Sequence, residues 1–296
     1  MDRLEAFEKA CAITESARKE ALKLVRPGVR AEEVADRLEA LMVELGGKPA
    51  FPVNVSLNDT AAHYAPELGD PLVFGEKDLV KIDLGAQVDG YPGDAAVTVD
   101  LSGENGKLVE ASERALETAI AMMKAGAQTR DIGAEVEKVI TDMGFRPIEN
   151  LTGHSLGRYD LHAGVSIPNI RTPHSYELKE GDVFAVEPFA TTGAGHVSET
   201  SKVLIFMLQA KKPTRLGEAR RMLDYIDANF STLPFAERWL YREFRSKVIA
   251  GASLRELIKN GSLHQYPVLK EIGKGLISQA EATVIIEKDS ARVLTR

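Results

Sequence analysis

Hydrophobic residues recur at helical spacing over two long stretches of the chain, at about residues 2–25 and 105–124. Each stretch is followed by a shorter helical pattern, and the two shorter patterns match each other at an offset of 98 positions. In both copies a glycine precedes the pattern, and a second glycine and a proline follow it. The matched positions are Gly28 and Gly126, Gly46 and Gly144, and Pro49 and Pro147. These shared residues favour an internal repeat over a chance likeness between amphipathic helices.

Runs with strand character follow each pair of helices, at residues 51–56 and 79–101 in the first copy and at 150–168 and 183–206 in the second. The pattern therefore predicts two pseudo-symmetric helix–helix–strand–strand halves. Helices on one side of a mainly antiparallel sheet would bury the apolar stripes, which gives a layered α+β fold. Such a pseudo-twofold arrangement places a ligand site where the two halves meet.

The pattern changes to short helices from about residue 208 to residue 270. Apolar positions within 216–230 form one helical face, Pro234 is expected to open a second helix, and Ser253 is expected to cap a third. Strand character returns after this region. We therefore predict a single domain over residues 1–296, with a helical insertion within its second half.

Composition excludes several classes of protein. The chain has 296 residues, of which 44% are hydrophobic and 27% charged, as is typical of a globular protein. A net charge of -7 argues against a nucleic-acid-binding surface, which is usually basic. The sequence begins without an apolar run, so we expect neither a signal peptide nor a membrane anchor. A single cysteine, Cys11, fits a cytoplasmic protein, and its place in a helical pattern predicts a core residue.

A β-hairpin is predicted in the most informative segment of the chain. Apolar and polar residues alternate over 80–84 and again over 94–101, which is the period of a strand. Asp89-Gly90 between the two runs is a strong signal for a two-residue hairpin turn. A bulge at Pro92-Gly93 would shift the register of the second strand.

Two carboxylates are expected on one face of this hairpin. With the turn at Asp89-Gly90, Asp83 faces Ala96, so Asp94 projects from the same face as Asp83. Two carboxylates aimed at one point repel each other unless a positive charge lies between them, and a divalent metal ion is the usual one. A solvated hairpin face is the alternative, and two aspartates alone do not decide against it.

Further candidate ligands lie in the second half of the chain. His154 lies between two glycines, Glu187 ends an apolar strand, and Glu281 begins a later one. Each of them alone is more commonly an ordinary hydrogen-bonding residue than a ligand. Together with Asp83 and Asp94 they would supply four carboxylates and one imidazole. The imidazole makes this set more suitable for Mn, Fe, Co or Zn than for Mg.

The chain resembles a type II methionine aminopeptidase of the archaeal kind over essentially all 296 residues. The segments that carry the resemblance are Phe51–Asn58 with Ala62-His63-Tyr64, Lys81–Asp94, Gly153–Gly157 with His162-Ala163-Gly164, Glu187-Pro188, Thr232–Phe235 with Arg238–Leu240, Tyr266–Leu269 and Gln279-Ala280-Glu281. The resemblance implies the pita-bread (creatinase/aminopeptidase) fold, with the helical insertion typical of type II enzymes. It also implies two divalent metal ions per chain, with the choice among Co, Mn, Fe(II) and Zn left open.

The resemblance also implies a role for each ligand. Asp83 would chelate one metal ion, Asp94 and Glu281 would bridge both, and His154 and Glu187 would complete the shell of the second. The family usually carries an aromatic residue before the last glutamate and a polar residue or histidine after it, whereas alanines occupy positions 280 and 282 here. This departure leaves the ligand intact and changes the packing behind it.

Catalytic and substrate-binding roles follow from the same resemblance. The implied reaction removes an N-terminal methionine by attack of a metal-bridging hydroxide on the first peptide bond, with Glu187 as the proton acceptor. His63 and His162 would contact the substrate, and one of them would donate to the developing oxyanion. The candidate walls of the methionine pocket are Phe51, Pro52 and Tyr266.

The expected partners are peptides and nascent proteins that begin with methionine, with the ribosome as one meeting place. We expect a cytoplasmic monomer that binds neither nucleic acid nor membrane. A proline-specific peptidase of the same fold is one alternative, but peptidases of that class carry a sizeable additional N-terminal domain. A non-catalytic binding protein is another, but such relatives have typically lost metal ligands, and this chain keeps all five.

Overall fold

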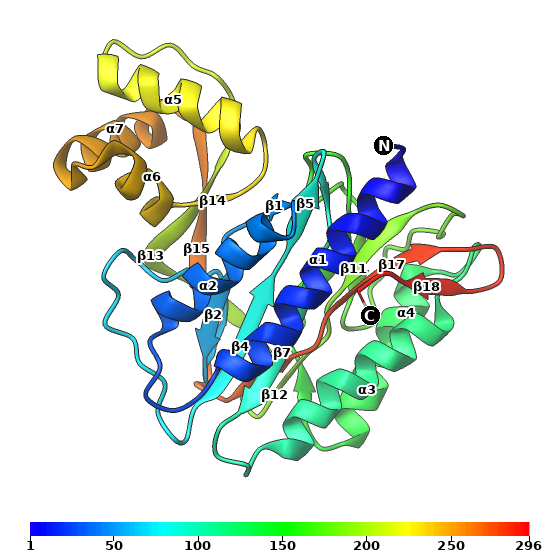
Figure 1. Ribbon diagram of the computed structural model, residues 1–296. Helices are drawn as coiled ribbons and strands as arrows, with labels where there is room; N and C mark the ends of the chain where they lie inside the picture. The colour runs from blue at the N-terminus through cyan, green and yellow to red at the C-terminus, as the bar shows by residue number, and fades with distance from the viewer. Residues whose placement is uncertain (296) are drawn as a thin grey trace.

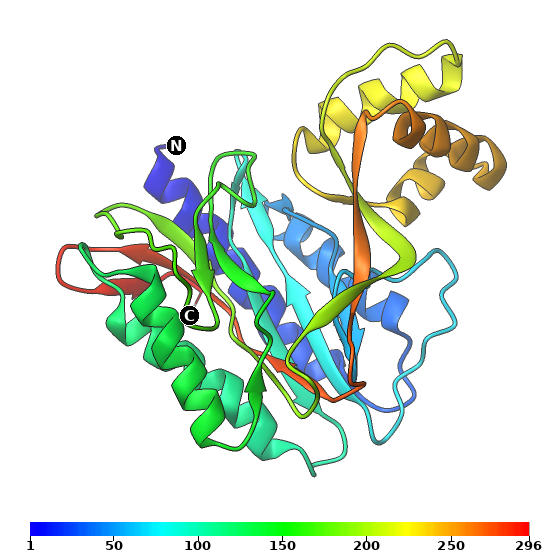
Figure 2. The same cartoon turned by 180° about the vertical axis from the view of Figure 1, so that it is seen from behind.

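The helices of the two halves lie on one side of the molecule and the strands on the other (Figures 1 and 2). The structure is a computed structural model that describes residues 1–295. Its helices are α1 (Arg3–Leu24), α2 (Ala31–Glu44), α3 (Gly106–Met122), α4 (Thr129–Asp142), α5 (Gly217–Phe230), α6 (Glu237–Phe244) and α7 (Lys247–Lys259). Helices α1 and α2 cover the strands of the first half, and α3 and α4 cover those of the second (Figure 1).

The internal repeat is confirmed by the backbone at its glycines. Helices α2 and α4 begin and end at equivalent positions, 98 residues apart. Gly28 and Gly126 precede them with φ of 85° and 86°, and Gly46 and Gly144 follow them with φ of 87° in both copies. Only glycine adopts such positive φ values without strain, so each copy needs a glycine at each of these turns.

The strands pair antiparallel throughout residues 1–295. The first half contains β1 (Lys48–Pro49), β2 (Asn54–Leu57), β3 (Thr60–Ala62), β4 (Leu79–Leu84), β5 (Ala86–Val88), β6 (Tyr91–Pro92) and β7 (Ala95–Asp100). Later strands are β8 (Arg146–Pro147), β9 (Thr152–Ser155), β10 (Ser166–Pro168), β11 (Val183–Val186), β12 (Phe189–Thr191), β13 (Val197–Leu208), β14 (Phe235–Ala236), β15 (Leu263–Glu271), β16 (Ile277–Gln279), β17 (Ala282–Ile286) and β18 (Ala291–Val293). Two central sheets have the orders β2-β4-β7 and β10-β9-β11-β17-β18.

Each half has its own hydrophobic core beneath its helices. In the first half, Val80, Ile82 and Leu84 of β4 pack against the apolar faces of α1 and α2. Because side chains alternate along a strand, Asp83 projects from the opposite face of the sheet. Cys11 is buried within α1, where burial raises the pKa of its thiol to about 12, and the prediction of a core residue is confirmed.

Helices α5, α6 and α7 form a separate group at one end of the molecule and pack around a core of their own, and α6 contacts α2 (Figures 1 and 2). They connect β13 to β15, two long strands that pair with each other. The boundaries of the predicted insertion, about 208 to 270, stay a prediction. Among residues 1–295, no helix combines the length and the apolar character that crossing a bilayer requires.

Two details of the predicted insertion are wrong. Pro234 does not open a helix, because Phe235 and Ala236 first pair with β13 as the short strand β14, and α6 begins only afterwards. Ser253 does not cap the third helix, because it lies buried inside α7. The cap is Ser246, whose hydroxyl accepts from the backbone N–H of Ile249. The first three residues of α7, Lys247–Ile249, are exposed, and the buried face of the helix begins only at Ala250.

Candidate metal centre

The five predicted ligands reach one region from five separate segments. Asp83 lies on β4, Asp94 just before β7, His154 on β9, Glu187 just after β11 and Glu281 just before β17. The hairpin has the predicted register, since Asp83 pairs with Ala96 and the turn lies at Asp89-Gly90. All five side chains line the same cavity at the junction of the two halves.

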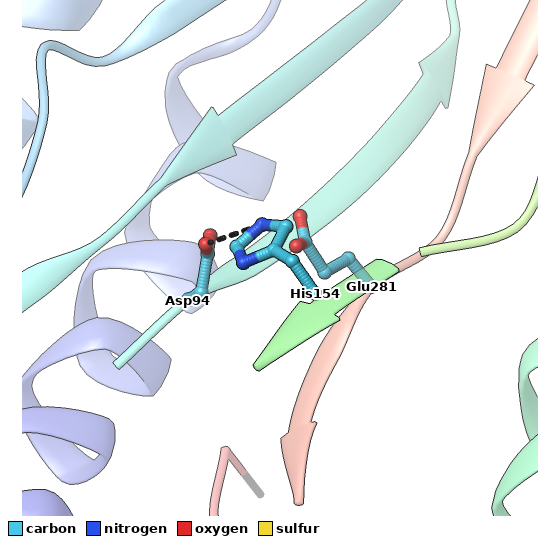
Figure 3. Close-up of side chains that lie close together, drawn as sticks. All are labelled: Asp94, His154 and Glu281. Carbon is cyan, nitrogen blue, oxygen red and sulfur yellow. Dashed lines mark ion pairs between the residues drawn. The ribbon is translucent and has the colours of Figure 1, made fainter. Parts of the chain in front are cut away.

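The side chains of Asp94, His154 and Glu281 converge (Figure 3). One ligand atom of each lies within 4.8 Å of one atom of each of the others. The imidazole Nε2 of His154 is 3.7 Å from Oδ2 of Asp94 and 3.5 Å from Oε1 of Glu187. The structure therefore places an imidazole nitrogen among carboxylate oxygens, at separations suited to sharing a metal ion.

The electrostatics of this cluster call for a cation. Burial raises the pKa of Asp83 to about 7, and burial and mutual repulsion raise the pKa values of Asp94, Glu187 and Glu281 well above their usual range. Burial lowers the pKa of His154 to about 3, so its imidazole is neutral and can act as a ligand. Oδ1 of Asp94 and Nδ1 of His154 are buried without a hydrogen-bond partner. Divalent metal ions would neutralise this charge, and the donor set fits them.

Two threonine side chains form hydrogen bonds across the junction of the two halves, beside the cluster. The hydroxyl of Thr283 accepts from the backbone N–H of Asp94 and donates to its carbonyl, both at 2.8 Å. The hydroxyl of Thr98 accepts from the N–H of Gln279 at 2.9 Å and donates to its carbonyl at 2.7 Å. Between β7 and the segment Gln279–Glu281 the backbones form an isolated bridge, at Ala96 and Glu281, in place of a regular ladder. The threonine hydrogen bonds beside it hold the two segments in register.

Gln279 is a site residue that the sequence did not reveal. Its side-chain amide lies 3.3 Å from a carboxylate oxygen of Asp83 and 3.4 Å from oxygens of Glu187 and Glu281. It is therefore placed to orient three of the candidate ligands. The available signal was its position two residues before Glu281, since alternate residues of an extended segment share a face.

The two predicted substrate histidines line the same cavity, which has a volume of about 250 Å³. Nδ1 of His63 lies 3.0 Å from the carbonyl oxygen of Pro267. Because a carbonyl only accepts, Nδ1 carries the hydrogen and Nε2 is left as an acceptor. The ring of His162 lies 4.4 Å from that of His154, measured between centroids. Burial lowers the pKa of His63 to about 4 and also lowers that of His162, so both are neutral.

Two of the three predicted pocket walls line the cavity. Phe51 and Tyr266 are among its lining residues, whereas Pro52 is buried outside that lining. A second hollow lies on the helix side of the sheet, between α1 and α3. The small side chains of Ala280 and Ala282 form part of its wall.

Comparison with known proteins agrees with this arrangement. Residues 5–207, more than two thirds of the chain, match the profile of metallopeptidase family M24. The chain belongs to metallopeptidase family M24. The methionine aminopeptidase of Pyrococcus horikoshii is 50% identical to this chain over 288 residues, which cover 97% of each chain. The resemblance to methionine aminopeptidases predicted from the sequence is thus confirmed.

Solved structures share the fold of this M24 chain. A thermophilic Arx1 has a TM-score of 0.85 at 19% identity and covers 98% of this chain and 90% of its own. Methionine aminopeptidase from Thermotoga maritima has a TM-score of 0.72 at 24% identity and covers 99% of this chain and 96% of its own. At such low identity these likenesses show the fold alone, and the predicted pita-bread fold is confirmed.

Proposed function

We propose that this chain is a metal-dependent methionine aminopeptidase that removes the N-terminal methionine from peptides and proteins. The observation that carries the proposal is the 50% identity, over nearly the whole of both chains, to a protein named methionine aminopeptidase. Membership of a metallopeptidase family and the buried cluster of Asp94, His154 and Glu281 support it. The retained set of five candidate ligands favours an enzyme over a non-catalytic binding protein of the same fold.

The experiment that tests the function compares two forms of one peptide. We expect the protein, supplied with divalent metal, to release free methionine from a peptide that begins with methionine. The Nα-acetylated form of the same peptide should stay intact, because the enzyme acts on a free N-terminus. Mass spectrometry of both reactions decides the matter. Cleavage within the peptide, or release of methionine from neither form, would refute the proposal.

Two divalent ions are the proposed cofactors, held by the five residues of the cluster. Asp83 would bind one ion, Asp94 and Glu281 would bridge both, and His154 and Glu187 would bind the other. Bound divalent ions supply a water of strongly lowered pKa and polarise the scissile carbonyl. The proposed ions are Co, Mn, Fe(II) or Zn, two per chain.

Glu187 acts as the proton carrier in the proposed reaction. Its carboxylate accepts the proton of the attacking water and then passes that proton to the leaving amine. The carboxylate lines the cavity among the other candidate ligands, with Oε1 3.5 Å from Nε2 of His154.

The two histidines orient the substrate by different hydrogen bonds, one as an acceptor and the other as a donor. His63 has committed its ring N–H to the carbonyl of Pro267, so its Nε2 accepts from an N–H of the substrate. The donor to the oxygen of the scissile carbonyl is therefore His162, which lines the cavity beside His154. This division of roles follows from the tautomer of His63.

Replacing either histidine should lower turnover without removing metal. For His63→Ala and His162→Ala we expect a loss of about a hundredfold in turnover, because each removes one contact that stabilises the transition state. Metal content, measured by mass spectrometry of the purified variants, should stay near that of the wild type. Loss of metal from either variant would show that the replaced histidine is a ligand and not a substrate contact.

Three further expectations from the sequence stay predictions. The protein would act as a monomer, in the cytoplasm, on nascent chains at the ribosome. The relatives support a peptide substrate that begins with methionine.

A further inference from the structure

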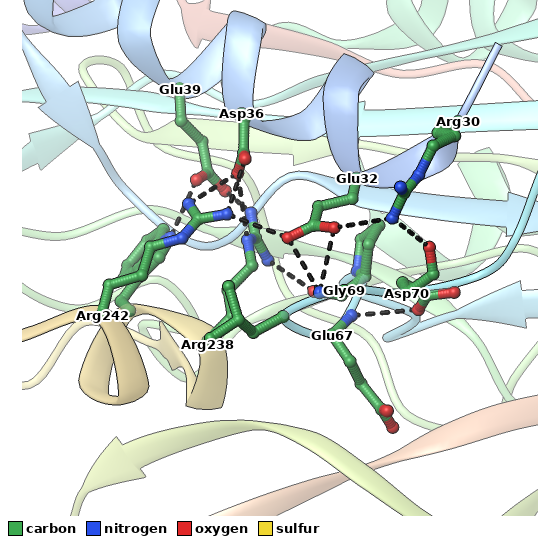
Figure 4. A network of polar contacts seen from close by, with 12 residues as sticks. Arg30, Glu32, Asp36, Glu39, Glu67, Gly69, Asp70, Arg238 and Arg242 are labelled. Carbon is green, nitrogen blue, oxygen red and sulfur yellow. Dashed lines mark hydrogen bonds and ion pairs between the residues drawn. The ribbon is translucent and has the colours of Figure 1, made fainter. Parts of the chain in front are cut away.

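An arginine at the start of α6, Arg238, is completely buried where the group of helices α5, α6 and α7 contacts α2. The side chain of Arg238 has no exposed surface. One guanidinium nitrogen pairs with the carboxylate of Glu39 on α2 (Figure 4). Another donates to the backbone carbonyl of Pro66 at 3.3 Å, and Nε lies 3.5 Å from Oδ1 of Asp36. Arg238 therefore joins the insertion to two separate segments of the first half.

Glu39 extends this connection towards the cavity. One of its carboxylate oxygens accepts from the backbone N–H of Val53 at 3.1 Å. The other accepts from the indole N–H of Trp239 at 2.8 Å. The carboxylate thus contacts the first half on one side and α6 on the other, and the side chain of Glu39 is 10% exposed.

The segments held in this way are three walls of the substrate cavity. Val53 lies between the lining residues Phe51 and Asn54, and Pro66 follows three residues after His63. The third wall is the segment that leads into α6, where Pro234 lines the cavity. Because one ion pair contacts all three segments, a change in that pair would shift the walls relative to one another.

Stability alone does not account for this ion pair. Removing two charges from water costs free energy that their attraction often fails to recover, and apolar residues of similar size commonly do as well. We propose that Arg238 and Glu39 are positioning residues, which hold the three walls at a fixed separation and so set how tightly the N-terminal side chain of the substrate is bound. This inference rests on the proposed aminopeptidase function.

The test replaces both charges together by methionine, as Glu39→Met with Arg238→Met. The double variant leaves no unpaired buried charge, so we expect it to fold. Its melting temperature should be lower than that of the wild type, because the N–H groups of Val53 and Trp239 lose their acceptor. KM for a peptide that begins with methionine should rise about tenfold while kcat stays within about twofold, because the walls bind ground state and transition state alike. The inhibition constant of free methionine should rise by a similar factor, and metal content should be unchanged.

Arg242→Met is the matched control on the same helix. Arg242 also pairs α6 with α2, through Asp36 at 2.6 and 2.8 Å and through Glu32 at 3.1 Å (Figure 4). These contacts lie nearer the surface and include none of the four cavity residues named above. They share Asp36 with Arg238, but the control leaves the Arg238–Glu39 pair in place. We expect the control to keep the wild-type KM and inhibition constant, even though it loses an ion pair between the same two helices.

A wild-type KM in the folded double variant would overturn the inference, and so would an equal rise of KM in Arg242→Met. If the double variant does not fold, Arg238→Lys replaces it. Lysine keeps a positive charge near Glu39 but cannot reach Glu39 and Pro66 with the two ends of a guanidinium group. A raised KM in Arg238→Lys supports the inference, and an unchanged KM overturns it. Failure of the proposed function is distinguishable, because the wild type itself would then release no methionine.

Discussion

Replacing Glu187 by glutamine is expected to lower turnover by about a thousandfold while leaving most of the metal in place. Glutamine keeps the shape of the side chain and one oxygen that can bind a metal ion. It cannot accept a proton from water at any pH at which the protein is folded. The cavity walls and His63 are untouched, so the variant should bind a peptide that begins with methionine and leave it uncleaved.

Turnover and metal content of one Glu187→Gln preparation separate two interpretations. If Glu187 carries the proton, activity per bound metal ion falls steeply. If Glu187 only holds metal, activity per bound ion stays near the wild-type value and the proton-carrier role is wrong. Asp83→Asn is the comparison. Replacing a residue that acts only as a ligand should lower the activity and the metal content of the protein in the same proportion.

The order of the elements could be predicted because the chain repeats itself. Two copies with glycines at equivalent turns fix where α2 and α4 begin and end, and Gly46 and Gly144 both adopt a positive φ that other residues avoid. The insertion was harder to predict. Proline is common as the first residue of a helix, which favoured a helix start at Pro234. The backbone there is decided by the pairing of β14 with β13, and a single sequence does not show that pairing.

Asp83 and Asp94 could be placed on one face because Asp89-Gly90 fixes the hairpin register. His154, Glu187 and Glu281 were grouped with them by the chemistry of their side chains and by the resemblance to a known family, because no local spacing connects these residues. The contacts that surround the ligands could not be predicted. Gln279 looks like any polar residue in an extended segment, and its three carboxylate neighbours come together only in the folded protein. Glu39 and Arg238 lie 199 positions apart, so no local pattern connects them.

Removing the metal should abolish peptidase activity altogether, because the site as a whole depends on divalent ions. Four buried carboxylates of raised pKa and a neutral imidazole form a donor set that suits divalent metal ions. We expect Co, Mn or Fe(II) to restore activity to the chelated and dialysed protein. Activity should rise with the number of ions bound, up to about two per chain.

The most direct test is therefore release of methionine from one peptide, followed in the same protein sample before chelation, after chelation and during titration with each metal. Metal content is measured at every step. The account predicts no release once the metal is gone and recovery that follows bound metal. Full activity in excess chelator, with the absence of metal verified, would contradict it.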